Sequence, residues 1–391
     1  MNYITCSWAG DDTNKIPLQI FILFVSCVVA LTLFVYLNAQ GEFPPGWTDP
    51  VRVGKSGRSF SLLVYDKIWL AFVRWGGKDE EIAISYSQDG IEWSTPYTFV
   101  EKSAEDLISP GSPKWLKRSN GDIWLLWSSG QGTAENVTGI VHYALLKEDG
   151  TFSTPRVIHS FDGEIYSFSS IANTSSGGLA MLEAYCPRTS LTIQGKEVQG
   201  SIYSNCVVQS ADETLEWNPP FLLSQTDFAW CIALFLDDQG TIWAVYEESD
   251  PIEGTYIRTS EDGIMWSEPH KVPAYVSKEF LQRHNGEYVV FYTVGDTSVY
   301  MTRSPDGVKW SSPTLAAHLE KAYDLDVTES DDGTLWMVIE GMGGFYITQY
   351  TDEKYQTDLY TLRSLRIKNA AACGVVVLVG ASLLFLTRKE R

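Results

Sequence analysis

A short hairpin pattern that recurs six times is the feature that most constrains how this chain can fold. Its clearest copy runs from Tyr323 to Glu340, where two runs of strand-forming residues flank the turn sequence Ser330-Asp331-Asp332-Gly333. Repeats of this period with several strands per unit are typical of a β-propeller. The second strands align on six apolar anchors spaced 46 to 64 residues apart: Trp69, Trp124, Leu179, Trp243, Val289 and Trp336. The sequence therefore predicts an all-β, six-bladed β-propeller.

A second motif, S-x-D-G-x-x-W, occurs in phase with the hairpins. In such a turn the Ser and Asp side chains accept hydrogen bonds from nearby amides, Gly adopts a positive φ, and the aromatic ring packs back between blades. We therefore expect the motif to stabilise the fold rather than to carry chemistry. Its three full copies contain Asp89, Trp93, Asp262, Trp266, Asp306 and Trp310.

These turns resemble the Asp-box of the sialidase (BNR-repeat) superfamily, and the similarity covers residues 51–357. The resemblance implies a six-bladed propeller with its site at the mouth of the central channel. It also implies that a Tyr at the start of the last inner strand is the nucleophile and that a Glu after the next strand is its partner. Tyr323 and Glu340 match that pattern.

The three arginines with which sialidases hold a substrate carboxylate are not recognisable in this chain. Arg58 fits the first position and Arg74 is a candidate substitute, whereas Glu247 or Glu248 occupies a position where arginine is expected. A glutamate there would repel a carboxylate substrate. Hydrolysis of sialic acid is therefore disfavoured.

Three of the six equivalent positions four residues beyond the anchors are glutamates: Glu183, Glu247 and Glu340. One explanation for this repetition is that glutamate is common at solvent-exposed strand ends. The other is that these carboxylates converge, raise one another's pKa or hold a cation, with Glu248 and Asp324 adding negative charge. Such an oxygen-rich site would suit calcium, although no cofactor is required.

Forty-nine acidic against 29 basic side chains give a net charge of −20, which argues against nucleic acid as a partner and favours a neutral or cationic ligand. We therefore expect a sialidase-like propeller that binds a glycan and that has Tyr323, Glu340 and Glu247 as the candidates for its hydrolysis. The expected substrate contacts are Glu183, Glu248, Arg58, Arg74 and Asp324. Alternatives are a non-catalytic binding or scaffolding propeller and, less favoured, a five-bladed furanosidase-like glycosidase.

Two uncharged segments, residues 16–37 and 370–387, are long enough to cross a bilayer as helices. Lys15 precedes the first span and no basic residue follows until Arg52, which favours cytoplasmic termini with the propeller outside. Cleavage of the first span as a signal peptide is the alternative. The expected order is a cytoplasmic tail (1–15), a span (16–37), a linker (38–50) and the propeller (51–357). A juxtamembrane segment (358–369), a second span (370–387) and a cytoplasmic tail (388–391) follow.

Three cysteines lie between the expected spans. Cys186 ends one predicted strand and Cys206 begins the next after a long insertion, so the two are expected to form a disulfide at the base of that insertion in an oxidising compartment.

Overall fold

The computed structural model describes most of the chain between residues 46 and 350. The described ranges are 46–48, 50–53, 57–75, 79–133, 136–162, 164–186, 191–194, 196–198, 205–226, 229–249, 252–272 and 277–350, with residues 3–4 and 16–17. Residues 47–351 form one unit, and the two ends of the chain form another, in which β1 (Tyr3–Ile4) pairs with β2 (Ile16–Pro17).

The expected spans, residues 16–37 and 370–387, lie outside the described residues except for Ile16 and Pro17. Within the residues that are described, no helix is long and apolar enough to cross a membrane.

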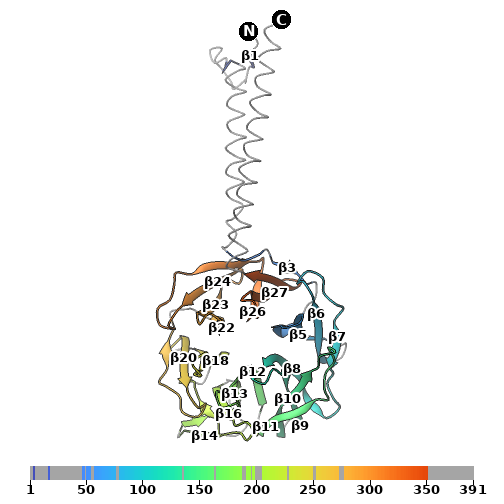
Figure 1. Cartoon of the computed structure of the whole chain (residues 1–391), viewed down its shortest axis with the longest axis vertical. Helices are drawn as coiled ribbons and strands as arrows, with labels where there is room; N and C mark the ends of the chain where they lie inside the picture. Colours follow the sequence, from blue (N-terminus) through green and yellow to red (C-terminus); the bar gives the residue numbers. More distant parts are fainter. Residues whose placement is uncertain are drawn as a thin grey trace, which may run out of the picture. The chain divides into compact units, whose positions relative to one another are not determined.

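Six antiparallel sheets of four strands surround a central channel, which confirms the predicted propeller (Figure 1). Blades 1 to 3 consist of β4 (Arg58–Val64), β5 (Ile68–Trp75), β6 (Glu80–Ser87) and β7 (Tyr97–Val100); β8 (Asp106–Lys117), β9 (Ile123–Thr133), β10 (Asn136–Leu146) and β11 (Arg156–Asp162); and β12 (Glu164–Asn173), β13 (Leu179–Cys186), β16 (Asn205–Ala211) and β17 (Phe221–Leu222). A separate hairpin of β14 (Leu191–Ile193) and β15 (Lys196–Val198) lies in the insertion between β13 and β16.

Blades 4 to 6 repeat the arrangement. They consist of β18 (Ala229–Leu236), β19 (Ile242–Glu248), β20 (Gly254–Ser260) and β21 (His270–Lys271); β22 (Ser277–Gln282), β23 (Tyr288–Val294), β24 (Ser298–Ser304) and β25 (Thr314–His318); and β26 (Ala322–Glu329), β27 (Leu335–Gly341), β28 (Gly344–Tyr350) and β3 (Val51–Arg52). The first strand of each blade is innermost and borders the channel (Figure 1).

The ring closes through the N-terminal strand β3, which pairs with β28 as the outer strand of blade 6. Trp47 also bridges to Tyr350, and the Val53 amide donates to the Phe345 carbonyl at 2.8 Å. The first and last described residues of the propeller consequently lie side by side.

Apolar side chains fill the spaces between blades. At the junction of blades 6 and 1, Phe345 makes edge-to-face contacts with Phe60 and Phe72, with ring centroids 5.0 and 5.3 Å away. All three rings are almost fully buried. Burying a phenylalanine side chain contributes about 1.5–3 kcal/mol, so these junctions supply much of the stability of the ring.

The S-x-D-G-x-x-W turns have the expected hydrogen bonds. Asp89 Oδ1 accepts from the amides of Ile91 and Glu92 at 2.8 and 3.0 Å, and the indole of Trp93 donates to the Gly90 carbonyl at 3.1 Å. The two amides lower the pKa of Asp89 by stabilising its charged form. The Asp262 and Asp306 turns repeat the amide contacts.

The glycine of a box also touches the preceding blade. Gly90 has φ +78°, and a Cβ there would lie 2.7 Å from the Trp336 ring of blade 6. Gly307 has the same relation to Trp243 of blade 4. In both cases a tryptophan anchor of one blade packs against the box glycine of the next blade.

We expect Gly90→Ala to lower the free energy of unfolding by about 3 kcal/mol, because a left-handed backbone and an overlap with Trp336 both penalise the methyl group. Gly121 is the matched control, since it has φ +92° but open space around a Cβ. Gly121→Ala should cost only about 1 kcal/mol. Urea unfolding followed by tryptophan fluorescence measures both, and equal losses would show that the contact with Trp336 is unimportant.

Candidate functional site

All six innermost strands carry a β-bulge or register shift near the channel mouth. The shifts lie between Arg58 and Phe60, Gly111 and Lys114, Phe168 and Ser170, Cys231 and Ala233, Ser277 and Glu279, and Ala322 and Asp324. The residues inside these shifts include Ser59, Ser112, Pro113, Ser169, Ile232, Lys278 and Tyr323. Bulges redirect side chains and are frequent beside functional sites. Here all of these residues except Tyr323 line one cavity.

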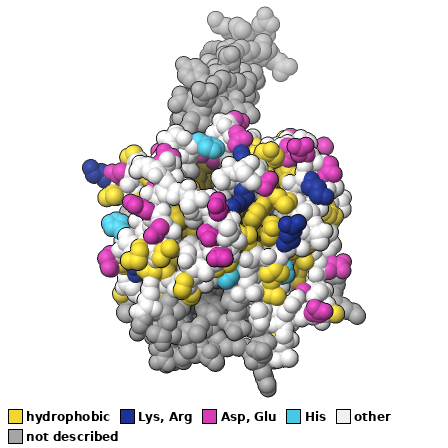
Figure 2. All heavy atoms as spheres, turned by 60° about the horizontal axis from the view of Figure 1, so that its bottom comes forward, with side chains coloured by type: hydrophobic (Ala, Val, Ile, Leu, Met, Phe, Trp, Pro, Cys, Tyr) yellow, Lys and Arg dark blue, Asp and Glu magenta, His cyan; other side chains and the backbone are white. Residues whose placement is uncertain are grey.

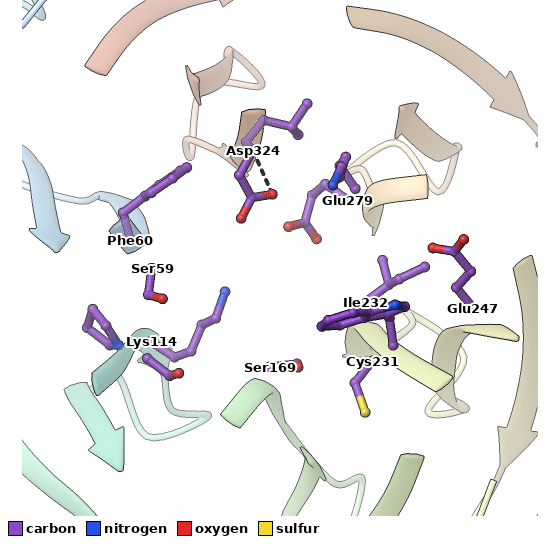
Figure 3. A pocket seen from close by; sticks show the side chains of 14 residues that line it. Ser59, Phe60, Lys114, Ser169, Cys231, Ile232, Glu247, Glu279 and Asp324 are labelled. Atoms are coloured by element: carbon purple, nitrogen blue, oxygen red, sulfur yellow. Dashed lines mark hydrogen bonds between the residues drawn. The ribbon is translucent and has the colours of Figure 1, made fainter. Parts of the chain in front are cut away.

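This cavity has a volume of about 440 Å³ and receives residues from all six blades. Its size falls within the range of small-molecule sites. Figure 3 shows the charged side chains of Lys114, Glu279 and Asp324 pointing toward its centre, with Glu247 at one side. The full lining is Ser59, Phe60, Ser112, Pro113, Lys114, Ser169, Trp230, Cys231, Ile232, Glu247, Lys278, Glu279, Asp324 and Leu325.

Both acidic and basic side chains line the cavity. The positive charge of Lys278 in β22 lowers the pKa of both Glu247 and Asp324. The positive charge of Lys114 in β8 lowers the pKa of both Asp324 and Glu279. Among the described residues, neither ammonium group lies within the 4.0 Å of a carboxylate that defines an ion pair. The opposite charges therefore face each other across open space, where a ligand can bind.

The surroundings of these carboxyl groups raise their pKa values. Loss of solvation within the channel raises the pKa of Glu247, an effect that Lys278 opposes. Asp324 is exposed to the cavity, yet the enclosing channel walls still raise its pKa, against the opposing charges of Lys278 and Lys114. Both groups are more easily protonated than ordinary surface carboxylates.

Glu279 has a more unusual environment. Loss of solvation and the negative charge of Asp326 raise the pKa of Glu279 well above its ordinary value, and the two carboxyl groups are hydrogen-bonded. The Leu62 amide donates to Asp326 Oδ2 at 2.6 Å and so fixes this carboxyl group beside Glu279. The raised pKa favours the protonated form of Glu279 next to the carboxyl group of Asp326.

A second, smaller cavity lies against the same pair. Its volume is about 140 Å³, and it shares Lys114, Ser169, Ile232 and Glu279 with the larger cavity. Asp326 lines only the smaller cavity. Glu279 and Asp326 therefore stand at the boundary between the two.

The structure brings only part of the predicted catalytic set to the cavity. Glu247 and Asp324 line it, whereas Tyr323 is 50% exposed on the bulge of β26 and outside the lining. Glu340 pairs in register with Asp324 and not with Tyr323. Loss of solvation and the nearby Asp324 raise the pKa of Glu340, and Arg58 opposes this.

The other predicted substrate contacts are engaged elsewhere. Glu248 is fully buried and accepts the amides of Gln225 and Thr226 at 2.5 and 3.1 Å, so it fastens a loop. Arg58 pairs with Glu80 at 2.6 Å, and Arg74 pairs with Glu81 at 2.6 Å. These contacts hold both arginines within blade 1.

Glu183 is 2% exposed and does not line the cavity, so the expected convergence of Glu183, Glu247 and Glu340 does not occur. Its Oε1 atom has no hydrogen-bond partner among the described residues, and burial raises the pKa of Glu183 to about 8. Equivalent strand positions differ because each inner strand is bulged in its own way.

Sequence reasoning missed Lys114, Lys278, Glu279, Ser169 and Trp230. Their only signal was the presence of charged residues inside strands expected to be apolar, such as Lys278-Glu279 before Phe280. The bulges decide which of these residues face the channel, and no turn residue in the sequence marks the position of a bulge.

The predicted disulfide between Cys186 and Cys206 is wrong. Cys206 is bonded to Cys231, with Cα atoms 5.8 Å apart, and so connects blade 3 to the inner strand of blade 4. In the sheet, Cys206 lies opposite Ala184, two residues before Cys186. The partner of Cys206 lies in the neighbouring blade, and a pattern within one repeat cannot reveal a pairing between two blades.

No group of three or more His, Cys, Asp or Glu side chains in the described part of the chain is arranged to hold a metal ion. Two lysines in the cavity also compete with a cation for the carboxylates. The predicted calcium stays a prediction.

Comparisons with known proteins show the fold. No protein-family model and no curated protein sequence matches the chain. A protein of unknown function from Dyadobacter fermentans is 13% identical with a TM-score of 0.57, over 78% of this chain and 100% of that one. The GH93 α-L-arabinofuranosidase of Fusarium graminearum, solved with arabinobiose, is 11% identical with a TM-score of 0.55, over 78% and 97%.

A Trypanosoma rangeli sialidase, solved with the inhibitor DANA, is 10% identical with a TM-score of 0.50, over 83% of this chain. This chain spans only 62% of that sialidase. The chain therefore has the propeller fold found in sialidases and GH93 glycosidases, as the Asp-box resemblance predicted.

We expect Glu183→Gln to stabilise the protein at pH 7 by about 3 kcal/mol and to leave it unchanged near pH 4.5. The folded-state pKa of about 8 exceeds the ordinary 4.5, so the folded state retains a proton that the unfolded state loses. Stability must then fall as pH rises through this interval, and glutamine removes the loss.

Urea unfolding at several pH values measures this effect, with Glu92→Gln at an exposed position as the control. A wild-type stability that stays level from pH 5 to 8, or a Glu183→Gln variant that is no more stable at pH 7, would contradict the assignment.

Proposed function

We propose that the central cavity binds a neutral glycan. The observation that carries this proposal is that Lys114 and Lys278 line one cavity together with the carboxyl groups of Glu247, Asp324 and Glu279. Sugar hydroxyls both donate and accept hydrogen bonds, so they satisfy ammonium and carboxylate groups at the same time. A ligand with a single strong charge would satisfy one set and be repelled by the other.

Trp230 and three serines add an apolar surface and uncharged hydroxyl groups to the site. Trp230 is 43% exposed at the cavity and offers an apolar surface to the C–H face of a sugar ring. Ser59, Ser112 and Ser169 add short hydroxyl groups without charge. The GH93 arabinofuranosidase solved with arabinobiose shares the propeller fold, which is compatible with this proposal.

Hydrolysis of the bound glycan is the second candidate, favoured by the protonated Glu279. In this reaction Glu279 gives its proton to the glycosidic oxygen, which leaves with the electron pair of its bond to the anomeric carbon. A water attacks that carbon and gives its proton to Asp324. Tyr323 with Glu340 stays the alternative catalytic pair, and a binding propeller without turnover is the other outcome.

We also propose that the protein is anchored in a membrane, with the propeller outside the cytoplasm. Three observations support this: the two uncharged segments in the sequence, the pairing of Trp47 with Tyr350, which brings the two ends of the propeller together, and the disulfide between Cys206 and Cys231. The acidic side chains spread over the face in Figure 2 fit a soluble domain facing an aqueous compartment.

A panel of immobilised neutral, acidic and amino-substituted glycans tests the binding proposal. Trp230→Ala should weaken binding of the best neutral glycan at least tenfold, which corresponds to ~1.4 kcal/mol. Trp75→Ala is the matched control, because Trp75 is 73% exposed at the end of β5 and does not line the cavity. Binding confined to sialylated glycans, or equal losses in the two variants, would contradict the proposal.

Turnover is tested with neutral aryl glycosides and an aryl sialoside. If the protein is a hydrolase, Glu279→Gln should reduce kcat at least a hundredfold while Tyr323→Phe remains active. The opposite result would return the catalytic role to Tyr323, and no turnover on any substrate would leave a binding propeller.

A further inference from the structure

The smaller cavity differs from the larger one in size and chemistry. At about 140 Å³ it is too small for a sugar ring with its substituents, but it has room for about four water molecules at ~30 Å³ each. Hydroxyl groups of Ser61, Ser169, Ser170 and Thr328 line it together with charged side chains. Polar cavities of this size hold water, and we refer to this one as the lower chamber.

Glu279 stands where the lower chamber meets the larger cavity, and Asp326 lies beside it on the chamber side. Glu279 lines both spaces and Asp326 lines only the lower chamber. The Leu62 amide fixes one oxygen of Asp326, and the Phe280 amide donates to Glu279 Oε1 at 3.1 Å. Backbone contacts from two blades thus hold both carboxyl groups in place, one facing both spaces and the other facing the chamber.

We propose that the Glu279–Asp326 pair is a proton relay between the sugar cavity and a water-filled lower chamber. Glu279 donates its proton to a ligand oxygen on one side, and Asp326 takes a proton from a hydronium ion of the chamber water on the other side and passes it to Glu279. These three proton transfers restore the pair, and no oxidation or other bond rearrangement is involved. The relay rests on the proposed function for the identity of the ligand, but the proton and the water are properties of the unliganded protein.

The charged groups around Glu279 determine how readily it ionises. Besides Asp326, Lys114 from β8 is the charged group that acts on Glu279, and Lys278, which precedes Glu279 in β22, and Asp324 from β26 line the same larger cavity. The described residues of β4, β12 and β18 present only uncharged side chains to the lower chamber. Removing Asp326 should therefore make Glu279 easier to ionise, and removing Lys114 should make it harder.

Infrared spectroscopy of the full-length chain in detergent tests for the proton directly. A protonated carboxyl group has a C=O stretching band separate from that of carboxylates, and Glu183→Gln serves as the background because Glu183 is the other acid expected to be protonated at neutral pH. In this background the band should persist at pH 7 and disappear in Glu279→Gln.

Two further variants should move the titration of the band in opposite directions. Asp326→Asn should shift its midpoint to lower pH by at least one unit, and Lys114→Met should shift it to higher pH. Lys117→Met is the control, since Lys117 pairs with Asp331 at 3.2 Å and does not line either cavity. These shifts do not require Glu279→Gln to fold. A band absent at pH 7, or unmoved by both variants, overturns the relay.

Exchange into D₂O tests the water. The band should shift to its deuterated frequency within the mixing time, and Thr328→Ile, which fills the chamber, should slow this at least tenfold relative to Thr328→Val. Exchange as slow as that of core amides would show that the chamber is dry. A glycan panel without binding would refute the proposed function while leaving these results intact, so the two failures are distinguishable.

Discussion

Closure of the ring by the short strand β3 is the constraint on which the rest of the structure depends. Blade 6 takes three strands from the end of the propeller and its outer strand from the beginning, so the ring closes only when Val51 and Arg52 pair with β28. The Phe60, Phe72 and Phe345 contacts across the junction of blades 6 and 1 then become possible. Without closure, the inner strands of blades 2, 5 and 6 would not surround a common axis.

The candidate site is a product of that convergence. Lys114, Glu279 and Asp324 come from three blades and lie far apart in sequence, yet each pKa effect described for the cavity involves a neighbour from another blade. A closed ring also limits the access of water to these groups, which strengthens their mutual electrostatic interactions. The result is a set of carboxyl groups that ionise less readily than those on the outer surface, with lysines that keep the cavity near neutrality.

Bulges account for the difference between the expected and the observed site. Counting four residues from each hairpin anchor treats the blades as identical, and this is correct for the second strands, where Glu183, Glu247 and Glu340 are equivalent by register. The side chains nearest the axis come mostly from the first strands, whose bulges differ in length and position. One extra residue turns the following side chains to the other face of the sheet, so Tyr323 leaves the cavity while Asp324 enters it.

The sequence by itself determined the number of blades and the boxes with their tryptophans, because both depend on local turn chemistry repeated at a regular interval. Asp89, Asp262 and Asp306 hydrogen-bond only residues within a few positions of themselves, so their roles can be deduced from a short motif. The tertiary structure decided the charges in the cavity, the pairing of Glu279 with Asp326 and the disulfide of Cys206 with Cys231. Each of these joins different blades, and their geometry depends on bulges and on ring closure, neither of which has a local sequence signal.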